Sequence, residues 1–303
     1  MKTRQVRALA LLTCLLSLMV VGVSAYLRLS GAGLGCADWP GCYGRILSGM
    51  SHAPWEGARL VHRIVATLAL LAGILLAWRS WRPQPLQPAA RYATLLLALM
   101  LFLSVVGVWS SDPRMAWVNF INLVGGLGLV TFSWRVAITS EPSRLMERGI
   151  GGQLCRVALT TLTLAVLLGG LIGARYAAPA CGGLPDCQGV WWPAAQGWSA
   201  LNPLATLSGP SIPGEAGGVA LHLLHRYAAV LAAVLLAVVA LRLRAVRRAR
   251  KAALVVLSLL VLEAAIGVLT VASGFSLWLA VAHNVGAALL LAAAASLMHS
   301  VRQ

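Results

Sequence analysis

The most regular feature of the sequence is a series of long apolar runs separated by polar or glycine- and proline-rich segments. The runs occupy about residues 8–27, 60–78, 92–110, 117–138, 157–174, 218–241, 252–272 and 279–299. Each is close to the length of about 20 apolar residues that crosses a bilayer as an α-helix. The pattern therefore predicts an all-α integral membrane protein with eight transmembrane helices.

The composition agrees with this pattern and excludes other classes of protein. Apolar residues make up 59% of the 303 positions and charged residues only 11%, a low share for a soluble domain. A soluble fold cannot bury so many apolar side chains, and disordered chains need low hydrophobicity. We therefore exclude both classes and expect the lipid bilayer to surround the chain.

The positive charge of the chain indicates its topology. Lys and Arg number 24 against 8 Asp and Glu, a formal net charge of +16, which in a soluble protein would suggest nucleic acid. Most of these basic residues fall at the N-terminus, in the tail, and in the alternate segments 79–91, 135–156 and 242–251. Cytoplasmic loops collect Lys and Arg. We predict both termini in the cytoplasm, a bacterial-type cytoplasmic (inner) membrane, and no nucleic-acid partner.

Three features of the sequence occur twice, in a similar order. LVHRIVA at 60–66 returns as LLHRYAA at 223–229, INLVG at 121–125 returns as AHNVG at 282–286, and each long outer loop holds a Cys-x5-Cys pair. With four helices in each copy, the copies would point the same way, as parallel repeats do. We predict two pseudo-symmetric four-helix bundles, residues 1–150 and 151–303. The alternative is chance similarity among apolar segments.

Polar side chains inside the predicted helices are the candidates for chemistry, because ionisable groups in a membrane are costly and usually face the bundle interior. Four of them lie at a similar depth near the outer ends of their helices: His62, Asn122, His225 and His283. Two imidazoles on facing helices can hold haem iron within a bundle, and His225 and His283 are placed to do so. The alternative is that they make polar contacts between helices.

Other charged residues accompany these histidines. Arg63 follows His62 and Arg226 follows His225, where each guanidinium could pair with a haem propionate at the outer mouth of its bundle. The haem sites would then lie towards the outer face. Glu263, inside the seventh helix, needs a partner or a proton, so a structural hydrogen bond and a role in proton transfer are both open.

The first outer loop resembles that of the haem A synthase family. The motif is Arg-x-Ser-Gly-x-Gly-x-x-Cys-x-Asp-Trp-Pro-x-Cys, which runs from Arg28 to Cys42. The His-Arg pairs of the second and sixth helices, the histidine that begins the eighth helix and the second Cys pair also match. The resemblance covers nearly the whole chain.

This resemblance implies a haem-dependent membrane oxidoreductase that oxidises the C8 methyl of haem O, by way of hydroxylation, towards the formyl group of haem A. In that family the second half holds haem b between two histidines, here His225 and His283. The first half holds the substrate, haem O, and its matching positions are His62 and Asn122. The implied partners are the farnesyltransferase that produces haem O and the assembly factors of a terminal oxidase.

Two positions depart from the family pattern. Asn122 stands where the family has a second histidine, and Arg59 stands where it has an acidic residue one turn before the first histidine. The nearest acid is Glu56, about 9 Å from His62 along a helix, which would need irregular backbone to reach the substrate. Our candidates for catalytic residues are Glu56 and Asn122, the latter by positioning oxygen or water beside an open iron.

These departures leave other functions open. A catalytically divergent haem b-binding protein, acting in electron transfer or oxidase assembly, would need neither Glu56 nor Asn122. A transporter built from two repeats is a further class, but the sequence shows no intramembrane charge cluster to support it.

The cysteines of the two outer loops lie on the oxidising side of the membrane, where disulfides persist. We expect the disulfides Cys36–Cys42 and Cys181–Cys187. They could staple the loops, or exchange with a thiol partner or electron donor above a haem. A zinc site is a third option, although Cys-x5-Cys is not its usual spacing.

Overall fold

The computed structural model describes residues 2–50, 56–140, 150–207, 209 and 211–301. Within these residues, eight helices are long and apolar enough to cross a membrane, which confirms the predicted all-helical membrane class. They are α1 (Lys2–Gly31), α2 (Glu56–Trp81), α3 (Ala89–Val106), α4 (Ala116–Thr139), α5 (Ile150–Ala174), α6 (Ala216–Leu243), α7 (Arg250–Ala272) and α8 (Leu277–Val301).

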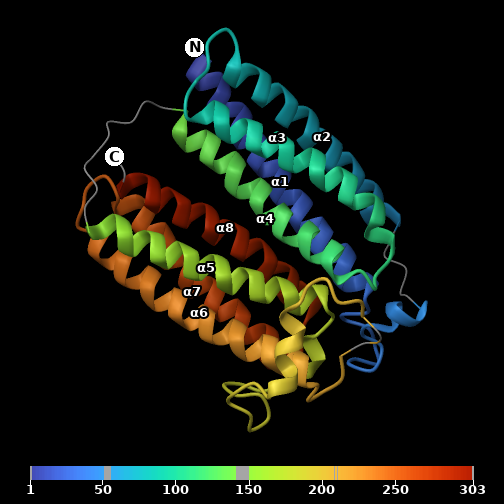
Figure 1. The fold of residues 1–303 in the computed structure, drawn as a ribbon. Helices are drawn as coiled ribbons and strands as arrows, with labels where there is room; N and C mark the ends of the chain where they lie inside the picture. The colour runs from blue at the N-terminus through green and yellow to red at the C-terminus, as the bar shows by residue number, and fades with distance from the viewer. Residues whose placement is uncertain (1, 51–55, 141–149, 208, 210, 302–303) are drawn as a thin grey trace.

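The helices pack in two groups of four, as Figure 1 shows. In the first group, α1 and α3 each pack against α2 and α4; in the second, α5 and α7 each pack against α6 and α8. The pairs α2/α4 and α6/α8 therefore stand diagonally across their groups. The chain passes from one group to the other through 141–149, which lies outside the described residues, beside the boundary predicted at 150.

Helix α8 joins the two groups. It packs against α1 and α4 of the first group as well as α5 and α7 of its own. Its run of small residues, Ala292–Ala295, is buried there, with at most 8% of any of these side chains exposed. Small side chains let membrane helices approach closely, so the alanines of α8 explain why it can have so many neighbours.

Large apolar side chains on the opposite faces of the helices point outward. Leu71 of α2, Val230 of α6 and Val261 of α7 are each more than half exposed. In a soluble protein such a surface would promote association, whereas in a bilayer it contacts the lipid tails. The distribution of these side chains agrees with the membrane class.

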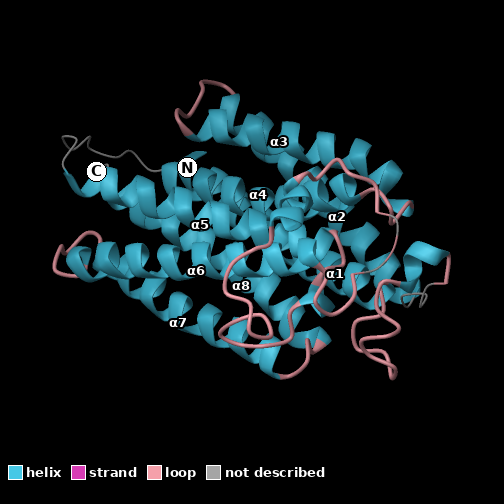
Figure 2. Ribbon diagram, turned by 60° about the horizontal axis from the view of Figure 1, so that its bottom comes forward, coloured by secondary structure: helices cyan, strands magenta, loops and turns pink. Residues whose placement is uncertain are grey.

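The loops lie at the two ends of the helices (Figure 2). We call two long ones the first loop (32–55) and the second loop (175–215). Their described residues lie at the same end, opposite the two chain termini (Figure 1). Their described residues meet in an aromatic cluster in which Tyr43 of the first loop contacts Tyr176 of the second, with ring centres 6.1 Å apart. The structure joins Cys36 to Cys42 and Cys181 to Cys187 by disulfides.

Candidate functional site

The structure brings two of the predicted residues together in the second group of helices. His225 of α6 and His283 of α8 face each other across the diagonal of the bundle, with ring centres 6.3 Å apart and ring planes at 87°. Bonds between imidazole nitrogen and a metal are about 2.0–2.1 Å long, so two imidazoles on opposite sides of one iron would have ring centres about 6 Å apart. The spacing of this pair fits a haem iron between the rings.

Each histidine has a polar group close to Nδ1, the ring nitrogen nearer the backbone. His225 Nδ1 donates to the carbonyl oxygen of Ala165 on α5, at 2.8 Å. His283 Nδ1 lies 3.0 Å from Oε1 of Glu263 on α7, although the alignment of the two groups falls short of a hydrogen bond. The hydrogen bond at Nδ1 of His225 fixes the tautomer of that ring and leaves its Nε2 as the nitrogen that could bind a metal.

Each imidazole lies against a glycine of the neighbouring helix. A Cβ at Gly169 of α5 would lie 2.9 Å from Cε1 of His225, and a Cβ at Gly267 of α7 would lie 3.1 Å from Cε1 of His283. Any larger residue would displace the rings from their positions. The sequence does not reveal this role, because a glycine in an apolar helix can equally serve close helix packing.

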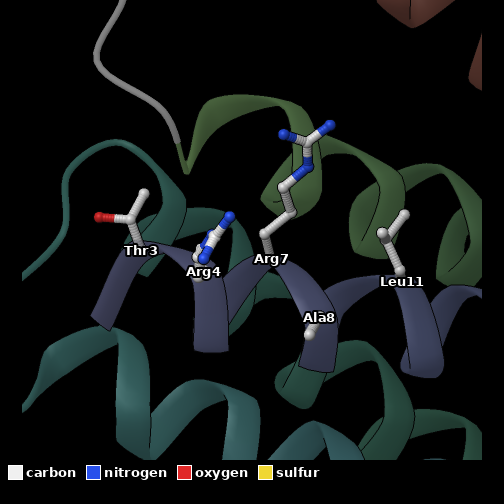
Figure 3. Close-up of a pocket in the computed structure, with 5 residues that line it drawn as sticks. All are labelled: Thr3, Arg4, Arg7, Ala8 and Leu11. Carbon is white, nitrogen blue, oxygen red and sulfur yellow. The ribbon is translucent and has the colours of Figure 1, made fainter. Parts of the chain in front are cut away.

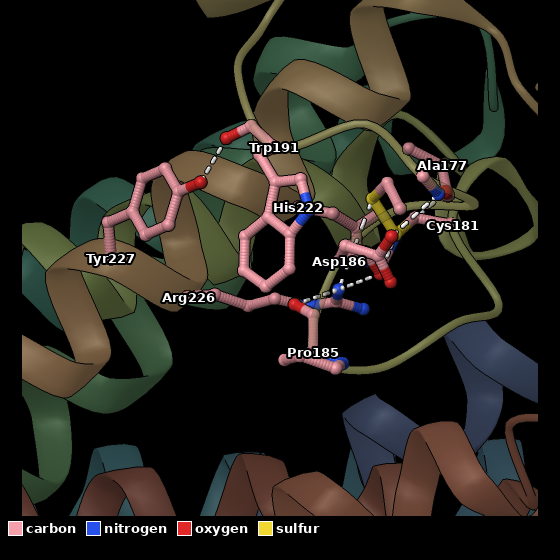
Figure 4. Close-up of a disulfide and its surroundings, with 10 residues drawn as sticks. Ala177, Cys181, Pro185, Asp186, Trp191, His222, Arg226 and Tyr227 are labelled. Atoms are coloured by element: carbon pink, nitrogen blue, oxygen red, sulfur yellow. Dashed lines mark hydrogen bonds between the residues drawn. A yellow bond between two sulfur atoms is a disulfide. The ribbon is translucent and has the colours of Figure 1, made fainter.

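Arg226, the residue after His225, contacts the second loop (Figure 4). Its Nη1 donates to the carbonyl oxygens of Pro185 and Asp186, at 3.2 and 2.9 Å, and lies 4.0 Å from Cys187 Sγ. Its Nη2 is buried and has no hydrogen-bond partner in the described structure. The guanidinium therefore holds the disulfide loop with one nitrogen and keeps a second buried donor for an anion such as a carboxylate.

Further contacts of α6 hold the second loop over the same end of the bundle. His222, one turn before His225, is buried, and its Nε2 lies 3.0 Å from the carbonyl oxygen of Ala177. The hydroxyl of Tyr227 donates to the carbonyl oxygen of Trp191 (Figure 4). The loop is thus fixed by side chains on both sides of the proposed haem ligand.

Helix α6 begins at a strong N-cap. The carboxylate of Glu215 accepts from the backbone N–H groups of Gly217 and Gly218, at 2.7 and 2.6 Å, and from the Ser211 hydroxyl at 2.8 Å. Burial raises the pKa of Glu215, but these hydrogen bonds and the charge of Arg175 together lower it by more. The pKa therefore lies below its usual value. The ionised carboxylate therefore stabilises the start of the helix that carries His225.

In the first group of helices, the two candidate residues do not form a pair. His62 on α2 and Asn122 on α4 occupy diagonal helices and are both partly buried. The structure records no hydrogen bond or ring contact for either side chain within the described residues. It therefore does not assemble a pair like that of α6 and α8.

The charged residues near His62 lie on the surface. Glu56, Arg59 and Arg63 are all exposed. Glu56 is the first residue of α2, and the helix is regular from there through His62, so the irregular backbone that would bring this carboxylate closer to His62 is absent from α2.

A buried polar cluster lies between the two groups. Nη2 of Arg28 on α1 donates to Oδ1 of Asn284 on α8, at 3.2 Å, and its buried Nε has no hydrogen-bond partner in the part of the chain described. Asn119 of α4 donates to the Tyr176 hydroxyl at 3.1 Å. Burial raises the pKa of Tyr43 and of Tyr176, so both phenols stay protonated. Arg28 is thus linked to the residue next to His283.

Comparison with known proteins identifies the family of this chain. The model of the COX15-CtaA family, described as cytochrome oxidase assembly protein, matches residues 7–59 and 114–295. The chain belongs to the COX15-CtaA family. It is 32% identical to the heme A synthase of Shewanella oneidensis over 92% of both chains. It is 31% identical to that of Novosphingobium aromaticivorans, over 79% of this chain and 69% of the relative.

The COX15-CtaA match is uneven across the site residues. It includes His225, His283, Asn122 and both Cys pairs, but it leaves out 60–113, which contains His62 and Arg63. The family comparison therefore supports the second group of helices more fully than the first.

A surface pocket lies elsewhere on this COX15-CtaA protein. Its walls are formed by residues of the first turns of α1: Thr3, Arg4, Arg7, Ala8 and Leu11 (Figure 3). This end of α1 is the one opposite the two long loops (Figure 1), so the pocket is separate from the histidine pair.

Proposed function

We propose that this COX15-CtaA protein is a haem A synthase, which oxidises the C8 methyl of haem O towards the formyl group of haem A. The single observation that carries the proposal is the His225–His283 pair, whose ring centres are 6.3 Å apart, close to the spacing expected across a haem iron. The relatives named heme A synthase, at 31–32% identity over most of the chain, support the same activity.

The second group of helices would hold haem b as a resident cofactor. A haem held by two histidines supplies one-electron transfer. His225 and His283 would bind its iron, and the buried Nη2 of Arg226 would pair with a propionate. The second loop, held by His222 and Arg226, would cover the outer edge of the site and exclude water.

The first group of helices would bind haem O as the substrate. His62 would hold the iron and Arg63 would pair with a propionate at the outer mouth. The amide of Asn122, a poor iron ligand beside imidazole, would position oxygen or water on the opposite side. Glu56 would take part in proton transfer only if the first turns of α2 unwound.

The topology follows from the charge distribution. We propose that residues 1–150 and 151–303 form parallel, pseudo-symmetric bundles with both termini in the cytoplasm. In a bacterial inner membrane, the histidine sites and both disulfide loops would then face the outer side. Haem O would come from a farnesyltransferase and haem A would pass to terminal oxidase assembly.

Analysis of the bound haems tests the proposal. The chain is coexpressed with a supply of haem O in a host that lacks haem A synthase, and the extracted haems are separated by chromatography. We expect haem A or its hydroxylated intermediate. The matched control is His62→Ala, which should retain haem b but form neither product. Absence of any haem from the wild-type protein would contradict the proposal.

A catalytically divergent haem b protein, acting in electron transfer or oxidase assembly, is the second candidate. The observations that favour it are Asn122 and Arg59, together with the exposure of Glu56. Haem b alone, in the presence of ample haem O, would establish this function in place of the first.

The two disulfides admit two roles under either function. Cys181–Cys187 would staple the second loop beneath Arg226, or exchange with a thiol donor. Mixed-disulfide trapping separates these roles, since a staple would yield no adduct in the folded protein.

A further inference from the structure

The environment of His283 contains a buried carboxylate that the proposed reaction has not used. Glu263 lies on α7, and its side chain is only 12% exposed. Neither carboxylate oxygen has a hydrogen-bond partner in the described part of the molecule, and the same is true of Nδ1 of His283. These buried polar groups lie 3.0 Å apart, so each is the nearest available partner of the other.

A glycine makes the space for this carboxylate. A Cβ at Gly286 of α8 would overlap Oε2 of Glu263 and lie 2.9 Å from its Cδ. Gly286 is one turn after His283 on the same helix. Any other residue at 286 would therefore drive the carboxylate away from its position beside the imidazole.

The first group of helices has the same packing without the carboxylate. In the repeated segments INLVG and AHNVG, Asn122 and Gly125 stand where the second copy has His283 and Gly286. A Cβ at Gly125 would lie 2.5 Å from Cδ2 of Leu103 on α3. In the first group, the space beside Gly125 is thus filled by a leucine. In the second group, the corresponding space beside Gly286 is filled by the carboxylate of Glu263.

We propose that Glu263 is a positioning residue for His283, seated in the space left by Gly286, and that it makes this ligand more electron-donating than a histidine without a carboxylate partner. The proposal rests on the haem b site of the proposed function. A carboxylate at Nδ1 orients a ligating imidazole and raises its basicity. His225, by contrast, has only the carbonyl oxygen of Ala165 at its Nδ1.

The expected consequence is a lower midpoint potential of the haem. A more basic ligand and a nearby negative charge both favour the ferric state over the ferrous state. Glu263→Gln removes the charge, while Gly286→Ala keeps it but displaces it. At a fixed potential, both variants should raise the ferrous-to-ferric ratio about tenfold. For a one-electron couple this corresponds to a midpoint potential raised by about 59 mV.

The experiment is a redox titration of the purified, haem-loaded full chain, followed by absorption spectroscopy. Glu263→Gln and Gly286→Ala should keep a six-coordinate low-spin spectrum with a raised potential. The matched control is Gly125→Ala, which adds the same methyl group at the corresponding place in the first group and should leave the potential unchanged. A potential of Glu263→Gln equal to that of the wild type would overturn the proposal.

A further variant separates this inference from the proposed haem site. His283→Ala should abolish the low-spin spectrum. If it does so while Glu263→Gln and Gly286→Ala leave the potential unchanged, only the role of Glu263 is wrong. If His283→Ala leaves the spectrum unchanged, the haem site itself is wrong and the inference fails with it.

Discussion

At the scale of single residues, the proposed haem site depends on glycines as much as on histidines. The imidazole of His225 lies so close to α5 that a methyl group at Gly169 would contact the ring at 2.9 Å. We expect Gly169→Ala to displace His225, at an overpacking cost of about 1–3 kcal/mol, and to reduce the low-spin haem bound per protein.

The control for this change is one turn further along α5. A Cβ at Gly173 would lie 3.6 Å from Leu123, which is ordinary van der Waals contact, so Gly173→Ala should bind haem normally. Absorption spectra of the two purified variants compare them directly, and equal haem content would show that the ring tolerates the methyl group.

Asn122 allows a second prediction at this scale. If it lies beside the iron of a haem held by His62, then Asn122→His supplies a strong sixth ligand and converts that haem to the low-spin form. The measurement is the spin state by absorption or paramagnetic resonance, compared with Asn119→His as the control on the same helix. An unchanged spectrum would show that Asn122 does not lie beside the iron.

Some of these site residues can be identified from the sequence alone, and others cannot. His225 and His283 could be selected as candidates because an ionisable side chain within an apolar membrane helix is costly and usually has a function. The pairing of Glu263 with His283 could not, since it depends on how α7 and α8 are rotated against each other. Likewise, the Nη1 of Arg226 contacts the carbonyl oxygens of Pro185 and Asp186, which no periodicity of side chains encodes.

At the scale of elements, the start of α6 decides how firmly His225 is held. The pKa of Glu215 is lowered in the folded protein, so this carboxylate stabilises the fold above its unfolded pKa of about 4.3. That contribution is lost as the pH falls through the lower, folded pKa. Glu215→Gln should therefore weaken the helix by about 1 kcal/mol at neutral pH.

The measurement for Glu215 is the midpoint of thermal unfolding in detergent at pH 7 and at a series of acidic pH values that passes below its lowered, folded pKa. The wild type and Glu215→Gln should differ at pH 7 and converge in acid, because the wild-type carboxyl is then protonated. Asp112→Asn, which changes an acid in the loop before α4, serves as the control. A difference that persists unchanged in acid would show that the charge of Glu215 is not what stabilises α6.

The helices themselves were the most predictable elements. Each apolar run became a helix because the bilayer core requires every backbone group to be bonded within its segment. Their ends were less predictable: α1 begins at Lys2, before the apolar run at 8–27, since Lys and Arg favour helices and can extend past the hydrocarbon layer.

At the scale of the whole molecule, the contact between Arg28 and Asn284 links the two groups of helices. The Nε of Arg28 is buried, and Asn284 supplies the side-chain oxygen that its Nη2 contacts, at 3.2 Å. Replacing this acceptor leaves a charged donor unsatisfied, which costs about 1–3 kcal/mol or more. Asn284→Leu should lower the thermal midpoint in detergent, whereas Asn284→Asp, which keeps an acceptor, should not. Equal midpoints for the two variants would contradict this assignment.

The position of α8 has a consequence for how the two halves communicate. Consecutive residues of this helix face different neighbours: His283 turns towards α6, and Asn284 towards Arg28 on α1. A rigid helix cannot translate at one residue and stay fixed at the next, so a displacement of His283 in the proposed haem site would also move the amide of Asn284. In the proposed haem site, the position of the His283 ligand in one group of helices would therefore be coupled to the position of α1 in the other.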